Sequence, residues 1–189
     1  MRKGEETRAR LVQTARRLFE SQGYTATGLQ QLLAESKTPR GSFYFHFPGG
    51  KEDVAAAVVQ AHAEAYSDGL DAIFEQAPDA LSAAEASLDL LGAQVTQSGC
   101  RAGCPVGAIT LEMANQSEAL RTLTRAAFDR WRQQISLRLQ AEGHAPAQAD
   151  TTARALLCAI EGALLLCRAY ADRGPLDDVR AQLSRWLAP

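Results

Sequence analysis

The stretch that decides the fold is residues 34–53, A-E-S-K-T-P-R-G-S-F-Y-F-H-F-P-G-G-K-E-D. It continues a short amphipathic segment, 27–35, which begins after a break at Gly23. Thr27 is expected to cap this segment, and Thr38 is expected to cap a second helix whose first turn contains Pro39. The order predicts two short helices joined by a tight turn, the second running from about Pro39 to Phe45.

Polar and aromatic side chains crowd the second of these helices. A helix that only packs into a core does not need so many of them in so few positions. Phosphates and base edges, by contrast, are bound by short hydroxyl groups, a cation and aromatic hydroxyl groups. The composition therefore predicts a helix that lies in a DNA groove, and the alternative is an ordinary helical hairpin with a solvated face.

The charges of the chain are unevenly distributed. Residues 1–51 hold nine Lys or Arg and four acidic residues, a net charge of +5. The remaining residues hold 11 basic and 18 acidic residues, a net charge of −7, so the whole chain carries −2. A basic end on an acidic body is typical of a protein that binds a polyanion at one end. Chance clustering is the alternative, and the position of the polar helix inside the basic segment argues against it.

Length and composition favour a helical protein of one large or two small domains. The chain has 189 residues, 46% of them hydrophobic, and it is rich in alanine and leucine. No apolar run approaches the ~18 residues of a membrane span, and the first residues do not resemble a secretory signal. We therefore expect a cytoplasmic protein with no membrane association and with reduced cysteines.

Helical periodicity runs nearly throughout the chain and predicts an all-α fold with about nine helices. We see no strand-like alternation and no internal repeat. The expected helices cover about 7–22, 27–35, 39–45, 51–75, 79–97, 105–114, 117–141, 147–172 and 176–187.

Three motifs in the first 60 residues carry a resemblance to a known family. They are T-R-x-x-L-V-x-x-A-x-x-L-F from Thr7, G-Y-x-x-T from Gly23, and G-S-F-Y-F-H-F from Gly41 followed by K-E-D from Lys51. Together they closely resemble the tetracycline-repressor (TetR) family of bacterial transcription regulators. The F-P-G-G-K turn and the later G-C-P-V-G, residues 103–107, resemble the branch that contains LmrA and YxaF. The resemblance implies a three-helix, helix-turn-helix DNA-binding domain, residues 1–50, and a helical body, residues 51–189, that binds an effector and dimerises.

Candidate DNA contacts follow from the polar helix and from the resemblance. Arg40 is the expected base reader because its guanidinium matches guanine, and Gly41 lets the backbone approach the groove. The three phenylalanines of the motif are expected to pack the domain together: Phe43, Phe45 and Phe47. The full set of predicted DNA contacts is Thr27, Lys37, Thr38, Pro39, Arg40, Gly41, Ser42, Tyr44, His46 and Lys51.

The resemblance also implies an effector pocket in the body. Its candidate walls are apolar or aromatic residues at helical spacing, together with a cysteine and a glutamate that interrupts an apolar helix. For each apolar residue, plain core packing is the alternative. The candidates are Leu91, Cys104, Val106, Ile109, Met113, Phe128, Trp131 and Glu161. The rings favour an apolar or aromatic effector.

The last two helices are the expected homodimer interface. Small residues on the penultimate helix would let two copies approach closely, and larger apolar residues would add buried area. Burial of the same faces within one subunit is the alternative. The candidates are Ala155, Ala159, Gly162, Ala163, Leu166, Leu183 and Trp186.

Nothing in the sequence indicates catalysis, a cofactor or a metal site. The three histidines lie in different elements, and no metalloprotease, P-loop or nucleophile-elbow motif is present. Cys100 and Cys104 lie in a glycine-containing turn. The two thiols could form a redox sensor or half of a metal site, and the preferred interpretation is that they are structural. The sequence predicts a dimeric, ligand-responsive repressor. The alternatives are a ligand-independent regulator or activator, and an enzyme or carrier that uses the body pocket.

Overall fold

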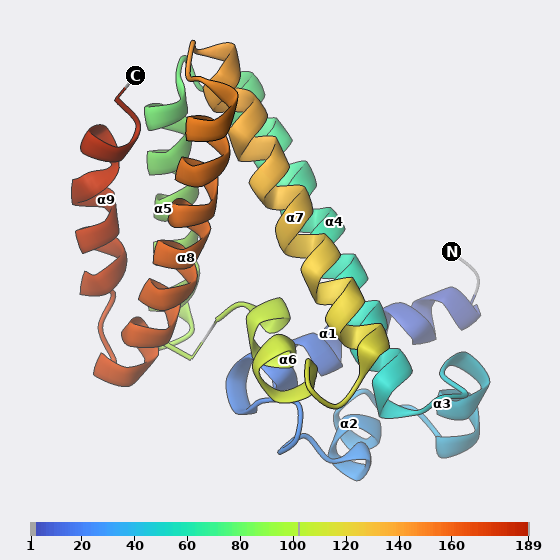
Figure 1. Cartoon of the computed structure of the whole chain (residues 1–189). Helices are drawn as coiled ribbons and strands as arrows, with labels where there is room; N and C mark the ends of the chain where they lie inside the picture. Colours follow the sequence, from blue (N-terminus) through green and yellow to red (C-terminus); the bar gives the residue numbers. More distant parts are fainter. Residues whose placement is uncertain (1–2, 102, 189) are drawn as a thin grey trace. The chain divides into compact units, whose positions relative to one another are not determined.

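The computed structural model describes residues 3–101 and 103–188, and within them the chain forms nine helices and no strand (Figure 1). They are α1 (Lys3–Gln22), α2 (Leu29–Glu35), α3 (Arg40–His46), α4 (Lys51–Gln76), α5 (Ala80–Gln97), α6 (Pro105–Met113), α7 (Glu118–Ala141), α8 (Pro146–Tyr170) and α9 (Gly174–Trp186). The predicted all-α fold is confirmed. Most ends differ from expectation by one or two residues, and α1 begins four residues earlier.

The chain divides into two compact units. The head unit is Met1–Ala63 together with Cys104–Ala127, and the body unit is Glu64–Gly103 together with Phe128–Pro189. Helices α4 and α7 contribute residues to both units. The head unit therefore contains α6 in addition to the three predicted DNA-binding helices.

The core of the head unit is built from apolar residues at helical spacing. Leu11 and Phe19 of α1 are fully buried, as are Leu32 of α2 and Phe43 of α3. Phe47, just beyond α3, lies with its ring centroid 5.9 Å from that of Phe43. Helix α1 packs against α2 and also against α6 (Figure 1). Helix α3 contributes Phe43 to this core, and several of its other residues are exposed.

Two predicted helix caps are wrong. Helix α2 is capped by Gly28, because the Thr27 hydroxyl donates to the backbone oxygen of Gly23 at 2.7 Å. Helix α3 has Pro39 as its N-cap residue, in extended geometry with φ −61° and ψ 146°. Thr38 therefore lies one position too early to cap, and its hydroxyl donates to the backbone oxygen of Ser36 at 3.2 Å.

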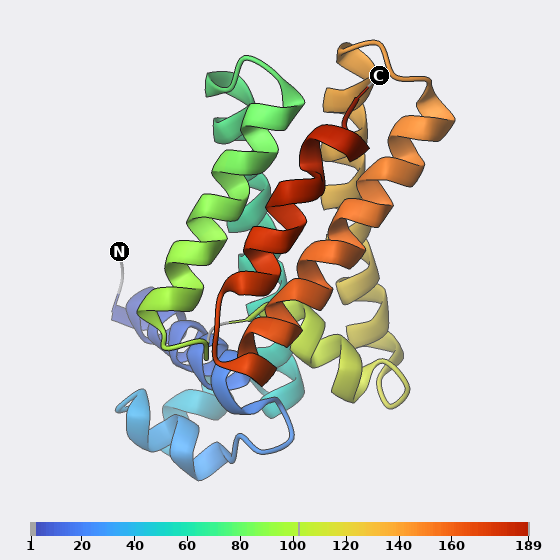
Figure 2. The ribbon, with the colours of Figure 1, turned by 90° about the vertical axis from the view of Figure 1, so that its left-hand side faces the viewer.

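In the body unit, α9 packs against both α5 and α8 (Figure 2). Asp79 caps α5 by accepting a hydrogen bond from the backbone N–H of Ser82 at 2.7 Å. Leu183 of α9 and Trp131 of α7 are almost fully buried in this unit. Across residues 3–101 and 103–188, no helix combines the length and apolarity that a membrane span requires.

Candidate DNA-binding surface and body cavity

Helix α3 turns one face inward and the opposite face to solvent. Successive residues of a helix are rotated by about 100°, so Phe43 and Phe47 share the buried face, and Gly41 and Phe45 share the opposite one. Phe45 is 82% exposed. The expectation that Phe45 packs the head together is therefore wrong, because the core holds only every fourth residue of this helix.

The exposed side of α3 carries most of the predicted DNA contacts. Pro39, Arg40, Gly41 and Tyr44 are exposed, and Ser42 and His46 are half-buried. The guanidinium carbon of Arg40 lies 5.8 Å from the ring centroid of Tyr44, a cation–π contact that orients both side chains. The helix thus presents a cation, hydroxyl groups and an aromatic face on one surface.

Lys37 occupies an unfavourable backbone conformation between α2 and α3. Its φ is +49°, in the left-handed region that favours glycine. The N–H of Lys37 donates to Ala34 and the N–H of Thr38 to Leu33, at 3.2 and 3.0 Å, which is the Schellman arrangement at a helix end. Glycine is the usual residue at this position. Because a strained residue is often kept for its function, the exposed Lys37 is a candidate functional residue.

Two predicted DNA contacts are buried instead. Thr27 is 0% exposed and Thr38 is 4% exposed. Their hydroxyl groups donate to backbone oxygens within the head unit, as described above, and Gln22 also donates to the Thr27 hydroxyl at 3.2 Å. These two threonines shape the turns around α2, and their side chains are withdrawn from the surface that DNA would meet.

Lys51, predicted to reach a phosphate, points its ammonium group into the head unit. Its Nζ donates to the backbone oxygens of Tyr24 and Thr27 at 3.0 and 3.1 Å. The same nitrogen lies 4.1 Å from the ring centroid of Tyr24. Burial lowers the pKa of Lys51, and the nearby charge of Glu112 partly offsets this effect. Lys51 thus holds the turn that precedes α2.

Glu112 of α6 binds the backbone N–H groups of the same turn, whereas Lys51 binds its carbonyl oxygens. Its carboxylate accepts hydrogen bonds from the backbone N–H groups of Tyr24 and Thr25, at 2.9 and 2.6 Å. Burial raises the pKa of Glu112, but these two hydrogen bonds and the charge of Lys51 outweigh it, and the net pKa is lowered. Gly23 has φ +89°, and a Cβ atom there would clash with the carboxylate. We call these contacts the Glu112 latch. The sequence offered no signal for it.

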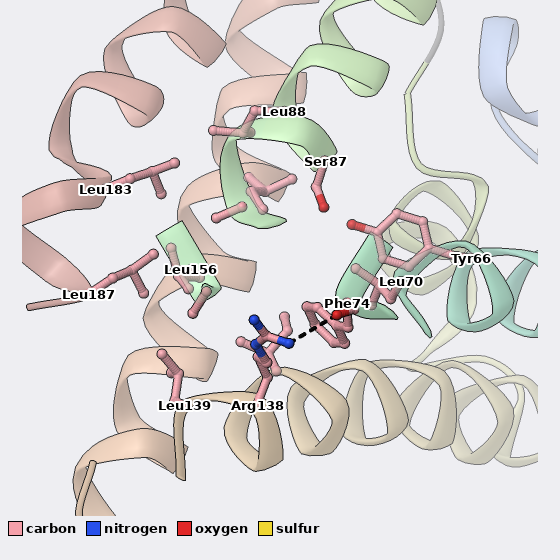
Figure 3. Close-up of a pocket in the computed structure, with 14 residues that line it drawn as sticks. Tyr66, Leu70, Phe74, Ser87, Leu88, Arg138, Leu139, Leu156, Leu183 and Leu187 are labelled. Atoms are coloured by element: carbon pink, nitrogen blue, oxygen red, sulfur yellow. Dashed lines mark hydrogen bonds between the residues drawn. The ribbon is translucent and has the colours of Figure 1, made fainter. Parts of the chain in front are cut away.

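The body unit contains a cavity with an apolar lining (Figure 3). About 500 Å³ of space lies among its lining side chains, a volume that includes open solvent. Side chains from α4, α5, α7, α8 and α9 line it, together with Leu187 just beyond α9. They are Tyr66, Leu70, Phe74, Ala80, Ala84, Ser87, Leu88, Ile135, Arg138, Leu139, Leu156, Ile160, Leu183 and Leu187.

The one charged side chain in this lining is already engaged. The Nη1 group of Arg138 donates to the backbone oxygen of Phe74 at 2.9 Å (Figure 3). Its Nη2 group donates to the backbone oxygen of Ala77 at 3.0 Å. Its Nε donates to Glu142 at 2.7 Å. Arg138 thereby satisfies carbonyl groups at the end of α4. The Ser87 hydroxyl in turn donates to the backbone oxygen of Ala83 at 2.9 Å.

The eight predicted pocket residues do not line this cavity. Four belong to the head unit: Cys104, Val106, Ile109 and Met113. The other four belong to the body unit: Leu91, Phe128, Trp131 and Glu161. In the latter unit the Phe128 and Trp131 rings meet edge to face, with centroids 5.4 Å apart. Val106, Ile109 and Trp131 are core residues, at most 2% exposed.

One cysteine has a structural position at the start of a helix. Cys104 is the N-cap residue of α6, and its sulfur accepts a hydrogen bond from the N–H of Gly107 at 3.4 Å. All four cysteines are free thiols. Among the described residues, no group of three or more His, Cys, Asp or Glu side chains is placed to hold a metal ion.

The predicted dimer residues fall into two groups. Ala163 and Leu183 are only 4% and 1% exposed, so they pack within the subunit, contrary to prediction. Ala155, Leu166 and Trp186 are exposed, and Ala159 and Gly162 are half-buried. The sequence reasoning missed two large exposed side chains on α8: Leu165 and Tyr170, which are 62% and 67% exposed.

Comparisons with known proteins agree with this architecture. Residues 11–58 match the tetR family of bacterial regulatory proteins. Residues 80–182 match the C-terminal domain of LmrA/YxaF-like transcriptional regulators. The HTH-type transcriptional regulator LmrA of Bacillus subtilis (strain 168) is 32% identical over 171 residues, which cover 90% of this chain and 91% of LmrA.

A second relative is the HTH-type transcriptional repressor DhaR of Mycobacterium sp. (strain GP1), 28% identical over 190 residues that cover 96% of this chain and 92% of DhaR. A TetR transcriptional regulator from Legionella pneumophila has the same fold, with a TM-score of 0.86 at 21% identity over 93% of this chain and 94% of that chain. The chain therefore belongs to the TetR family, with an LmrA/YxaF-like C-terminal domain, and is a transcriptional regulator rather than an enzyme.

Proposed function

We propose that this regulator is a cytoplasmic repressor that binds operator DNA as a homodimer and leaves it when a small, uncharged, largely apolar effector binds. Residues 1–50 supply the DNA contacts, and residues 51–189 supply the effector site and the dimer interface. The repressor name of DhaR supports the direction of regulation. A ligand-independent regulator and an activator are the alternatives.

The observation that carries the proposal is the exposed face of α3. It combines exposed Arg40 and Tyr44, one helical turn apart, with half-buried Ser42, inside a segment with a net charge of +5. Base edges are read by guanidinium and hydroxyl groups, and phosphates by cations. The proposed contacts are Lys37, Pro39, Arg40, Gly41, Ser42, Tyr44 and His46.

The exposed face of α8 is the proposed dimer interface. Apart from its chain neighbours and its own helix backbone, no atom lies within 4 Å of the place where a Cβ on Gly162 would stand, so the rest of the subunit leaves that position open. Leu165, Leu166 and Tyr170 leave large apolar surfaces uncovered nearby on the same helix. Burying them against a second copy would stabilise a dimer. A two-fold dimer matches the two half-sites of a palindromic operator.

The body cavity is the proposed effector site. An apolar lining favours an apolar ligand. Arg138 already pairs with Glu142 and donates to two backbone oxygens, so its charge is largely compensated. The apolar lining therefore favours an uncharged effector, with Tyr66 and Ser87 near it as hydroxyl groups.

The Glu112 latch is the proposed link by which α6 acts on the three DNA-binding helices of the head unit. It joins α6 directly to the turn before α2, so a displacement of α6 would pull on Tyr24 and Thr25. An effector changes DNA affinity only if it prefers one position of the head over another.

A gel-shift titration with the DNA upstream of the chain's own gene tests the proposal. Operator affinity should fall steeply as salt rises, because phosphate contacts release counterions. Uncharged aromatic compounds that raise the melting temperature should release the DNA, since the two effects are linked. Affinity that does not change with salt would contradict DNA binding through the basic surface. Stabilising compounds that leave operator affinity unchanged would contradict the effector-controlled repressor.

A further inference from the structure

Phe45 is a large, exposed apolar side chain of α3 that the proposed function does not use. It is 82% exposed, although phenylalanine is normally buried. Its ring meets that of the adjacent His46, with centroids 5.1 Å apart. The core is complete without it, because Phe43 and Phe47 already fill the interior beneath α3.

The position of Phe45 makes it the foremost apolar group of the exposed face. It lies about 200° around the helix from Phe43, and Gly41 lies one turn before it on the same side. A Cβ on Gly41 would meet nothing within 4 Å. A bare glycine beside a projecting ring lets the helix approach a surface closely while the ring reaches into it. This inference rests on the proposed use of α3 in the major groove.

In the major groove the apolar feature of the base pairs is the 5-methyl group of thymine, and phenylalanine is one of the side chains that contact it. The Arg40 guanidinium and the hydroxyl groups of α3 can bind polar base edges, but they do not recognise a methyl group. We propose that Phe45 reads thymine in each half-site of the operator through its 5-methyl group, and so selects A·T over G·C at that position.

The test removes the methyl group without changing the base pairing. The operator is first selected from random duplexes with the full-length protein, and each thymine of one half-site is then replaced singly by deoxyuridine. At one or two positions the wild-type protein should bind about fourfold more weakly, the effect of one methyl-sized group removed from water. Phe45→Ala should bind thymine and deoxyuridine duplexes equally well at those positions.

The controls separate this inference from the proposed function. Leu111→Ala changes an equally exposed side chain, 81% exposed, on α6 and should retain the wild-type response to deoxyuridine. Equal wild-type affinity for thymine and deoxyuridine at every position would overturn the inference while leaving operator binding intact. If Phe45→Ala lowers operator affinity but the wild type shows no deoxyuridine effect, the ring contributes by insertion between bases. This outcome also contradicts recognition of the thymine methyl group. Failure to select any sequence would overturn the proposed function itself.

Discussion

The carboxylate of Glu112 accepts a hydrogen bond from the backbone N–H of Tyr24 at 2.9 Å, across 88 positions of the sequence. Thr25 donates to the other carboxylate oxygen, and Lys51 holds the carbonyl side of the same turn. The turn is therefore held by a negative group at its donors and by a positive group at its acceptors. Such charge-assisted hydrogen bonds are stronger than those between neutral groups.

Removing this carboxylate should loosen the head. We expect Glu112→Ala to destabilise the protein by about 1–2 kcal/mol, because two backbone donors lose their acceptor. The melting temperature should then fall by about 2–8 °C. Amide hydrogen exchange at Tyr24 and Thr25 should accelerate. Glu118→Ala, which removes an exposed carboxylate paired with Arg121, is the control and should have little effect. Unchanged exchange at Tyr24 would contradict the latch.

The latch should also depend on pH. The folded pKa of Glu112 is lowered, so its stabilising contribution is present above the ordinary glutamate pKa and is lost as the pH falls through the lowered value. The difference in unfolding free energy between the wild type and Glu112→Ala should therefore shrink on acidification. Urea titrations of both proteins at neutral and acidic pH measure it. A difference that stays constant would show that ionisation of Glu112 does not matter.

His62 predicts a separate loss of stability in mild acid. Burial, and secondarily the charge of Arg16, lowers the pKa of His62 from 6.5 to about 4. As the pH falls, His62 is protonated near pH 6.5 in the unfolded chain but only near pH 4 in the folded chain. The free energy of unfolding therefore falls between pH 6.5 and 4, by up to about 3 kcal/mol. His62→Gln should flatten this part of the curve in urea unfolding. The same slope in both proteins would rule out His62 as its source.

Lys37 lets backbone strain be separated from charge. Lys37→Gly should stabilise the protein by up to about 1 kcal/mol, because glycine relieves the left-handed strain but costs more entropy on folding. Lys37→Ala loses the same charge and keeps the strain. If Lys37 contacts a phosphate, both variants should bind DNA more weakly and reduce the salt slope by about 1. Undiminished DNA binding by both would remove Lys37 from the interface.

Arg40 should carry base specificity. We expect Arg40→Ala to cost about 1–3 kcal/mol on the operator and much less on random DNA. Competition binding with both DNAs measures the ratio. Arg154→Ala, which removes an exposed cation of the body unit paired with Asp150, is the matched control. Equal losses on operator and random DNA would make Arg40 a phosphate contact.

Gly162 tests the dimer face without disturbing the subunit. Since the rest of the subunit leaves its Cβ position open, we expect the subunit to accommodate Gly162→Leu and the leucine to clash with a second copy. We expect a monomer by light scattering with an unchanged helical circular dichroism spectrum. Gly69→Leu places the same side chain at another open helical glycine, on α4, and should leave the oligomeric state as it is. A dimer that survives Gly162→Leu would move the interface elsewhere.

The sequence predicted the features that depend on local periodicity. The nine helices, the buried pair Phe43 and Phe47, and the exposed Arg40 all follow from residues a few positions apart. Thr27 and Thr38 were misplaced because a hydroxyl near a helix start has two uses. It can cap the helix, or it can turn inward and bond a backbone oxygen, and long-range packing decides between them.

The latch and the cavity could not be predicted in this way. Glu112 looks like one more charged residue on a short helix, and its role depends on a turn far away in the sequence. Large aromatic residues such as Trp131 suggested a pocket but pack into the core. A cavity forms where neighbouring side chains fail to fill the space between helices, as around Leu156 and Leu183, and residue type alone does not reveal such places.

The clash that a side chain at Gly23 would cause has a consequence for building hybrid regulators. The reading head of this protein is not one continuous piece of chain, because its first turn is completed by a carboxylate from α6. A chimera that joins residues 1–63 to the body of another regulator would leave the N–H groups of Tyr24 and Thr25 without the Glu112 carboxylate. A larger side chain from that other regulator could also lie against Gly23. The transferable cassette consists of two segments, 1–63 and 104–127, and they must be exchanged together.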